Sequence, residues 1–549
     1  ADGSTVTTES DSETFDAGVG WFREPDAREV GLVPGFAKGV VRSVLPGFLE
    51  DKVADARLRL TPERVSLGTS YFQQDSRIFR FERIIEGALD DQAAATFAPR
   101  EFLESAADVR LRPLQPLTAS LTLLTVRDLL PPIESAAAPE VQSLIAAERT
   151  GLAGVDLGWE TSRTLRTALG YRPSIFSWLR TDFDWTTVYQ SERNTNFVER
   201  TFAGADTTVA LARNARGQRD WGTTVALSPA GVAQGLFGEP AEGESPDIAQ
   251  LRAIFGAVQP LSVTYRDGIT SRFNRDPIDP RLEYQFGFGG VERYRFIGAD
   301  TAASLTDRST WRLGSGVTLP AGAGVRVGYQ ISDATTLDTR SERRTTQRTW
   351  PDVQGTLPTL RPPRFLGIQA ISVTSGIVRT TRETEFGGRA LQRRFDSDTR
   401  VPLDLSIQWV RTLVTTYRGL FRSGRGVDPT GRTEREQQSH RVSLSSQLLP
   451  PSALARRLDR PIRLSLLGAV TSELNCRITA QGDNCVAFVD QLTRTASVSM
   501  DTSAGGFEFG LQVSFDDRQS FVGQQTGSTQ FQVGIFGQLD FAAGALPIR

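Results

Sequence analysis

Apolar residues recur at every second position along most of this chain. Between Phe507 and Phe515 every odd-numbered residue is apolar, and every even-numbered one is polar or glycine. A β-strand has a side-chain period of two, so such a strand carries all its large apolar side chains on one face. The C-terminal segment from Phe531 to Phe541 repeats the pattern. The sequence therefore predicts two long, two-faced strands near the C-terminus.

The same alternation recurs in earlier segments, with tight reversals or longer polar stretches between the runs. A tally of alternating runs predicts an all-β, antiparallel fold of roughly 14 to 18 strands. Further alternating runs are Leu117–Leu123, Leu179–Tyr189, Leu282–Phe288 and Leu403–Trp409. The reversals include Leu58–Leu67, Pro113–Pro116, Val317–Val327 and Pro450–Pro451. The expected long loops are Asn214–Gln218, Thr335–Arg348, Ser423–Ser439 and Asp516–Gln530.

The N-terminal part of the chain lacks this regularity. Residues 1–18 are polar, acidic and rich in Ser and Thr, which predicts a disordered lead-in. Residues 19–56 contain three prolines between short mixed segments and are interpreted as irregular. The alternating pattern assigns residues 57–549 to the sheet, with short helical insertions expected at 90–106 and 136–149 because both are rich in alanine.

Alternation alone does not distinguish a soluble β-sandwich from a transmembrane β-barrel. Strands of nine to eleven alternating residues exceed the usual soluble length of about five or six, and they suit a tilted bilayer crossing. Tryptophan and tyrosine lie near the ends of the apolar runs, as in an interfacial girdle. Full charges stand in mid-strand, where a hydrated lumen solvates them and a lipid or protein core does not. We therefore favour a transmembrane β-barrel, or a large segment of one, and keep a secreted or periplasmic β-sandwich for adhesion or binding as the alternative.

The barrel interpretation assigns a face to particular residues. We expect the pore-lining side chains to include Arg180, Asp182, Asp184, Asp404 and Gln408. We expect the lipid-facing side chains to include Phe507, Phe509, Leu511, Val513, Phe515, Phe531, Val533 and Ile535.

Composition removes several other classes of protein. The 62 basic residues nearly balance the 64 acidic ones, so no overall positive charge suggests nucleic acid as a partner. No run approaches the about 18 consecutive apolar residues of a membrane helix. The arginine-rich stretches 340–344 and 411–425 are solvated loop ends or sites for anionic lipopolysaccharide or phosphate.

The residues that could carry chemistry are few. His440 is the one histidine, no Gly-x-Ser-x-Gly motif is present, and we interpret His440 as a solvated loop residue. The glycines of 286–290 lack the Lys-Ser/Thr of a phosphate-binding loop. Cys476 and Cys485 are the two cysteines, in one polar segment, and favour a disulfide over free thiols or a metal pair. We expect no catalytic residues, no metal and no cofactor.

Several segments resemble SprA-like outer-membrane translocons, the large barrels of type IX secretion and gliding motility. They are Gln259–Tyr265, Ser271–Arg275, Asp279–Gly289 and Arg348–Val353, with weaker support from the Cys476–Cys485 segment. The resemblance implies a non-catalytic, protein-conducting pore in a bacterial outer membrane, in contact with lipid and lipopolysaccharide. It also implies secreted protein cargo and plug or accessory subunits as partners. Within the barrel class the alternative is a self-contained porin or solute transporter.

Overall fold

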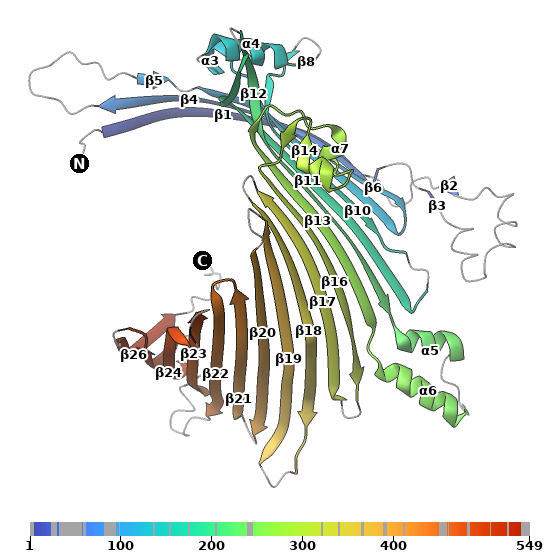
Figure 1. The fold of residues 1–549 in the computed structure, drawn as a ribbon, viewed down its shortest axis with the longest axis vertical. Coiled ribbons are helices and arrows are strands. Elements are labelled where there is room, and N and C mark those ends of the chain that lie inside the picture. The colour runs from blue at the N-terminus through green and yellow to red at the C-terminus, as the bar shows by residue number, and fades with distance from the viewer. Residues whose placement is uncertain are drawn as a thin grey trace, which may run out of the picture. The chain divides into compact units, whose positions relative to one another are not determined.

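The computed structural model places most of the chain in long antiparallel strands (Figure 1). It describes residues 5–22, 30–31, 57–58, 62–81, 95–97, 99–135, 138–152, 155–173, 176–203, 206–238, 245–319, 322–338, 341–363, 367–387, 392–409, 412–448, 458, 460–479, 482, 484–504, 507–523 and 526–539.

One sheet contains twenty of the described strands, more than the 14 to 18 predicted. Its N-terminal members are β1 (Thr5–Phe22), β4 (Arg64–Phe81), β5 (Ala95–Phe97), β6 (Arg100–Leu114), β7 (Leu117–Asp128), β10 (Trp159–Tyr171), β11 (Leu179–Ala203), β12 (Asp206–Leu227) and β13 (Leu261–Asp276). Its later members are β16 (Ser304–Thr318), β17 (Gly324–Asp338), β18 (Glu342–Leu360), β19 (Ile368–Gly387), β20 (Gln392–Trp409), β21 (Val414–Asp428), β22 (Gly431–Leu448), β23 (Ile462–Thr479), β24 (Val486–Ala504), β25 (Phe507–Ser520) and β26 (Thr526–Leu539).

Short helices and two-residue ladders occupy the connections. The helices are α3 (Pro132–Ser135), α4 (Pro139–Glu148), α5 (Pro229–Phe237), α6 (Pro246–Ala257), α7 (Leu282–Gln285) and α8 (Val291–Arg295). The ladders pair β2 (Val30–Gly31) with β3 (Arg57–Leu58), β8 (Gly151–Leu152) with β9 (Val155–Asp156), and β14 (Phe296–Ile297) with β15 (Asp300–Thr301). Among the described residues, no helix combines the length and the hydropathy that a membrane crossing requires.

The chain forms two compact units, each considered by itself below. Unit 1 consists of Ala1–Val225, Thr264–Ser309 and Ala334–Glu342. Unit 2 consists of Ala226–Val263, Thr310–Asp333 and Arg343–Arg549.

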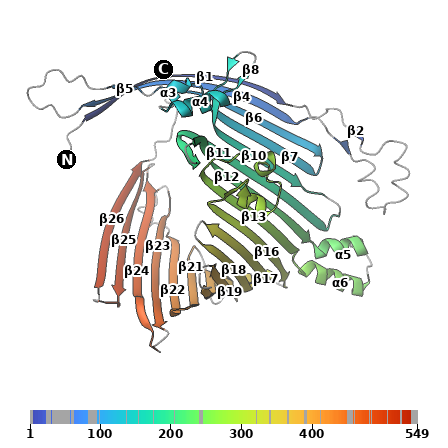
Figure 2. The ribbon, with the colours of Figure 1, turned by 45° about the horizontal axis from the view of Figure 1, so that its top comes forward.

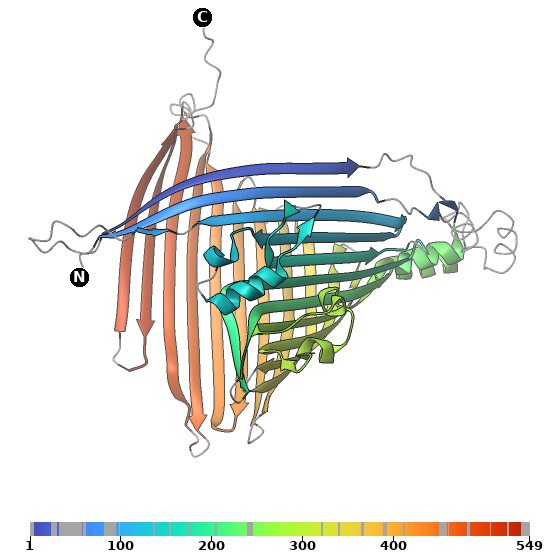
Figure 3. The same cartoon turned by 90° about the horizontal axis from the view of Figure 1, so that it is seen from above.

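In unit 1, β1, β4, β6, β7, β10 and β11 pair antiparallel in that order, and the blue strands of Figure 3 run side by side. The predicted disordered lead-in at 1–18 is wrong for residues 5–18, because they belong to β1. Phe15 and Val19 of β1 lie opposite Tyr71 and Leu67 of β4. The backbone ladder requires no apolar surface, so an acidic, Thr-rich segment pairs as well as an apolar one. Residues 19–22, predicted as irregular, continue β1.

In unit 2, β19 to β26 form an antiparallel meander in which each strand pairs with the next (Figure 2). These strands have 14 to 20 residues, whereas about 9 to 11 are enough for a bilayer. Most expected long loops are wrong for this reason. Asn214–Gln218 lies within β12, and most of Ser423–Ser439 lies within β21 and β22. These segments are polar on both faces, which predicts a loop, but their backbones continue the strands.

The predicted reversals had mixed outcomes. The turn at Pro113–Pro116 joins β6 to β7. The Val317–Val327 hairpin joins β16 to β17. The Leu58–Leu67 hairpin is wrong, because Leu58 pairs with Val30 of β2 rather than with β4. The reversal at Pro450–Pro451 lies outside the described residues.

Two of the local predictions were wrong about secondary structure. The expected strand Leu282–Phe288 contains helix α7, and Tyr284 and Phe286 of this segment pack onto the sheet, while Leu282 and Phe288 are exposed. The expected helix at 90–106 is wrong where the chain is described, since β5 and β6 cover most of that part. The other expected helix, at 136–149, is confirmed as α4, whose Val141 and Ile145 pack against Trp159 of β10.

Candidate functional site: the two faces of the sheet

The meander of unit 2 separates apolar from charged side chains. Opposite residues in an antiparallel pair project to the same face, so the register defines the members of each face. The apolar face comprises Val401, Leu403, Leu405 and Ile407; Tyr417 and Phe421; Val442 and Leu444; Leu464, Leu466 and Val470; Ala496, Val498 and Met500; Phe507, Phe509, Leu511, Val513 and Phe515; and Phe531, Val533 and Ile535.

The apolar face is exposed rather than packed against a second layer of the described chain. Phe531 is 66% exposed, Val533 58% and Ile535 84%. On β25, Phe507, Phe509, Leu511 and Phe515 are also exposed, and Val513 is half-buried. A soluble sandwich would bury this row in its core. A contiguous exposed apolar surface of this size marks contact with another apolar phase.

The opposite face of the same strands, here the charged face, carries ionised and amide side chains. Its members include Asp396, Asp398, Arg400, Asp404 and Gln408 of β20; Arg418 and Arg422 of β21; Arg435 and Arg441 of β22; and Glu473 of β23.

Cross-strand ion pairs connect the charges of this face. Asp404 lies opposite Arg418 and their side chains are 3.4 Å apart. Asp398 accepts from Arg400 at 2.7 Å and from Arg422 at 2.6 Å. Asp404 and Gln408 are exposed. The alternation of β20 places Asp404 and Gln408 on the polar face. It does not predict that Arg418 lies opposite Asp404, because the sequence of one strand does not show its register with the next.

The pore-lining residues predicted in unit 1 form a second charged group, on β11. Arg180 donates to Asp182 at 2.9 Å, and Arg172 lies 3.3 Å from the same carboxylate. The carboxylate of Asp184 lies against Gly222 of β12. Phe183 projects to the other face, where it meets Trp221. The alternation predicted for this strand is therefore correct, and Arg172 is a partner that the sequence did not suggest.

Along β20 to β26 the apolar side chains gather toward one end of each strand. We call this the apolar end, and it holds Trp409, Val414, Leu448, Ile462, Ala504, Phe507 and Leu539. The other, polar end holds Gln392, Asp428, Gly431, Thr479, Val486, Ser520 and Thr526. Past Phe421, residues Ser423 to Asp428 of β21 extend about 20 Å toward the polar end.

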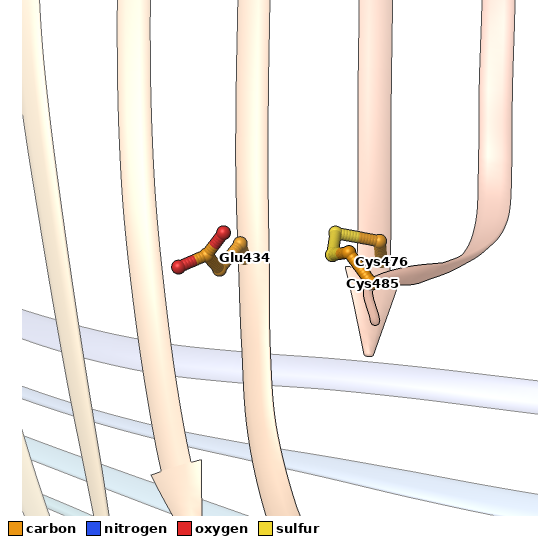
Figure 4. A group of neighbouring side chains, drawn as sticks. All are labelled: Glu434, Cys476 and Cys485. Atoms are coloured by element: carbon orange, nitrogen blue, oxygen red, sulfur yellow. A yellow bond between two sulfur atoms is a disulfide. The ribbon is translucent and has the colours of Figure 1, made fainter. Parts of the chain in front are cut away.

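The two cysteines lie at the polar end and form a disulfide that joins β23 to β24, with Cα atoms 5.4 Å apart (Figure 4). The predicted disulfide is confirmed. Glu434 of β22 lies beside it and completes the one group of potential metal ligands found among the described residues. Because both sulfur atoms are bonded to each other, neither offers the thiolate that a metal would bind.

His440 is not a loop residue, contrary to the sequence interpretation. It lies within β22 on the apolar face, opposite Gly419 and Val470. Its Nδ1 hydrogen-bonds Tyr417 Oη at 2.8 Å. The Phe421 ring meets the imidazole edge-on, with 5.4 Å between the ring centroids. Farther toward the polar end, the same face carries one more exposed apolar pair, Phe395 opposite Val427.

In unit 1, the segment that contains α7 and α8 covers part of the sheet. Tyr284 of α7 packs on Gly217 and hydrogen-bonds Ser271 of β13 at 2.7 Å. Arg219 of β12 donates to the carbonyl of Gly289 at 2.6 Å and pairs with Asp267 at 2.8 Å. Tyr189, which ends the alternating run Leu179–Tyr189, belongs to the buried cluster beneath this segment and therefore does not face an interface. Burial raises the pKa of Tyr294 from 10.0 to about 12.

Comparisons with known proteins give little beyond these observations. No family model matches the chain, and no curated protein matches it. Among solved structures, OccAB3 of Acinetobacter baumannii is similar, with a TM-score of 0.23 and 9% identity, over 86% of this chain and 98% of that one.

Proposed function

We propose that the protein is an outer-membrane β-barrel, or a part of one, whose charged face lines a water-filled passage for polar solutes and which performs no catalysis. The observation that carries the proposal is that the same strands expose apolar side chains on one face and paired charges on the other.

A lipid bilayer explains both faces at once. The apolar face loses nothing on contact with hydrocarbon, and in β19 to β26 the backbone groups of neighbouring strands pair with each other, as a span through lipid requires. The charges cannot enter hydrocarbon cheaply, because an arginine at the bilayer midplane of a barrel costs about 2 to 4 kcal/mol. A hydrated interior solvates them, and Arg180, Asp182, Asp184, Asp404 and Gln408 then act on passing solutes through charge.

The polar ends of the strands suggest the orientation. Outer-membrane barrels have short periplasmic turns and longer extracellular loops, and we take strand ends that reach past the apolar face as the counterpart of such loops. Strands β21 and β22 extend well past the apolar face at the polar end, which also carries the Cys476–Cys485 disulfide. A disulfide suits either side of an outer membrane, because the periplasm is oxidising too, so the strand extensions alone carry the orientation. We therefore place the polar end outside a bacterial outer membrane, near lipopolysaccharide.

The SprA-like resemblance leads to a narrower proposal, in which the passage conducts proteins and binds secreted cargo and plug subunits. Barrels of 16 to 18 strands leave an aqueous channel, so the twenty-stranded sheet by itself supports a solute pathway more directly than passage of a folded protein. The two proposals differ in pore size. In liposomes, uptake of small sugars but not of folded protein favours the solute channel, whereas single-channel conductance far above that of a general porin favours the translocon.

The proposal is tested first by asking whether a detergent-stable barrel forms. Protein extracted in mild detergent is run on a gel with and without boiling. We expect the unboiled protein to migrate differently, and the protein to fractionate with the outer membrane. Extraction into buffer without detergent, together with identical migration, would support the soluble β-sandwich and contradict the proposal.

Conduction is tested in planar bilayers. We expect stepwise ion currents from the reconstituted protein, with the Asp404→Asn variant shifting ion selectivity toward anions. The matched control is Asp517→Asn, because Asp517 lies opposite Arg494 on the other face of the sheet. A folded, inserted protein that passes no current would overturn the channel assignment.

A further inference from the structure

The polar end of unit 2 contains a groove of about 550 Å³ on the charged face. Five arginines and two carboxylates of the charged face line it, from β19 to β22. The arginines are Arg382, Arg394, Arg400, Arg422 and Arg435; Arg425 and Glu434 also line the groove, but the register assigns them to the opposite face. A chain that is nearly neutral overall therefore places an excess of positive charge in one concavity.

Like charges lie directly opposite each other at the centre of this groove. Arg400 of β20 is the register partner of Arg422 of β21. Opposed like charges destabilise a strand pair, and here one carboxylate, Asp398, serves both guanidinium groups. Two positive charges therefore share one negative charge.

Two further arginines contact only neutral groups among their described hydrogen bonds. Arg382 of β19 donates to the Gln347 side-chain oxygen at 2.8 Å, and Arg435 of β22 donates to the Asn475 side-chain oxygen at 2.9 Å. Each bond leaves most of the donors of a guanidinium uncommitted. Both side chains are exposed, so a solute in the groove can reach them.

We propose that this groove binds a soluble multivalent anion bearing carboxylate or phosphate groups. Planar guanidinium groups match both kinds of oxyanion in bidentate geometry. The inference rests on the proposed function in one respect: if the charged face lines the passage, the groove is an anion-binding site at the extracellular end of that passage. The binding chemistry itself requires no membrane.

The test is a calorimetric titration of the full chain in detergent with inorganic phosphate, and separately with succinate. We expect saturable binding of at least one probe. The double variant Arg382→Gln/Arg435→Gln removes the two arginines that have neutral partners. We expect its dissociation constant to rise about tenfold or more, since a hydrogen bond to a charged group contributes about 1.5 kcal/mol or more.

The matched control is Arg379→Gln/Arg393→Gln, which removes the same charge, one arginine from β19 and one from β20. The register places Arg379 and Arg393 on the opposite face, outside the groove. We expect this variant to bind like the unmodified protein. Gel mobility without boiling confirms that each variant is folded.

The probes identify the source of the anion. Binding of phosphate alone points to a phosphorylated solute, and binding of succinate alone points to a dicarboxylate. Absence of binding by both, or equal weakening in both double variants, overturns the inference. Because binding is measured without conduction, a protein that binds but passes no current would contradict the proposed channel and leave the anion site standing.

Discussion

Neighbouring residues of β26 face different surroundings, so the same substitution has different consequences at consecutive positions. Val533 lies opposite Val513 on the apolar face, and Gln532 lies opposite Ser514 on the other face. Lipid would contact the first side chain and water the second.

Arginine at these two positions tests that difference. We expect Val533→Arg to reduce the free energy of unfolding by about 2 to 4 kcal/mol, because a charge would face lipid. Gln532→Arg serves as the control, with an expected change within about 0.5 kcal/mol. Urea unfolding in lipid vesicles measures both. Equal effects of the two variants would show that the two faces meet the same medium.

Tyr294 gives a prediction about pH. Its pKa is raised from 10.0 to about 12 because the hydroxyl is buried. In the unfolded chain the Tyr294 hydroxyl therefore loses its proton at a lower pH than in the folded chain. Its contribution to the free energy of unfolding is complete below pH 10.0 and is lost as the pH rises toward about 12. Alkaline titration followed by tyrosinate absorbance checks this. Replacement of Tyr294 by Phe should remove the component near pH 12 and leave the later one of Tyr284, whose pKa burial raises further; an unchanged titration would contradict the assignment.

At the scale of elements, the segment containing α7 and α8 depends on one glycine of the strand beneath it. A Cβ atom at Gly217 would lie 2.6 Å from the Tyr284 ring. Substitution there forces the tyrosine away from Ser271 or moves the whole segment.

We expect Gly217→Ala to destabilise the docked segment by about 1 to 3 kcal/mol, as overpacking does. Gly290→Ala is the matched control within the segment, because nothing lies within 4 Å of a Cβ at that position. The rate of trypsin cleavage at the exposed Arg281 and Arg293 reports docking. Unchanged cleavage in Gly217→Ala would mean that Tyr284 does not hold the segment.

The same elements show what the sequence reveals and what it conceals. The period-two pattern correctly predicted β25, β26, β7 and β20, because each has one apolar face. It failed at Leu282–Phe288, since alternating apolar residues also occur in a folded segment that packs on a sheet. It also missed β1 and the polar ends of β21 and β22, where backbone pairing continues without an apolar face. The charged groove was hidden for a related reason: Arg400 and Arg422 become neighbours only through the register.

Across the whole molecule, long antiparallel strands separate two environments. The disulfide and the anion groove both lie at the polar end of unit 2, and the apolar face lies toward the other end. The channel and the orientation both follow from which medium each face meets, whereas the anion site rests on the arginines of the groove alone.

That dependence is measured most directly by spin labels along β25 and β26. Single cysteines replace residues 511 to 515 and 531 to 535 in turn, in a protein whose native cysteines are serine, reconstituted in lipid vesicles. We expect the accessibility of the labels to alternate with a period of two. Labels at odd positions should collide with oxygen dissolved in the lipid, and labels at even positions with a water-soluble nickel complex. Equal accessibility to the nickel complex at odd and even positions would contradict the account.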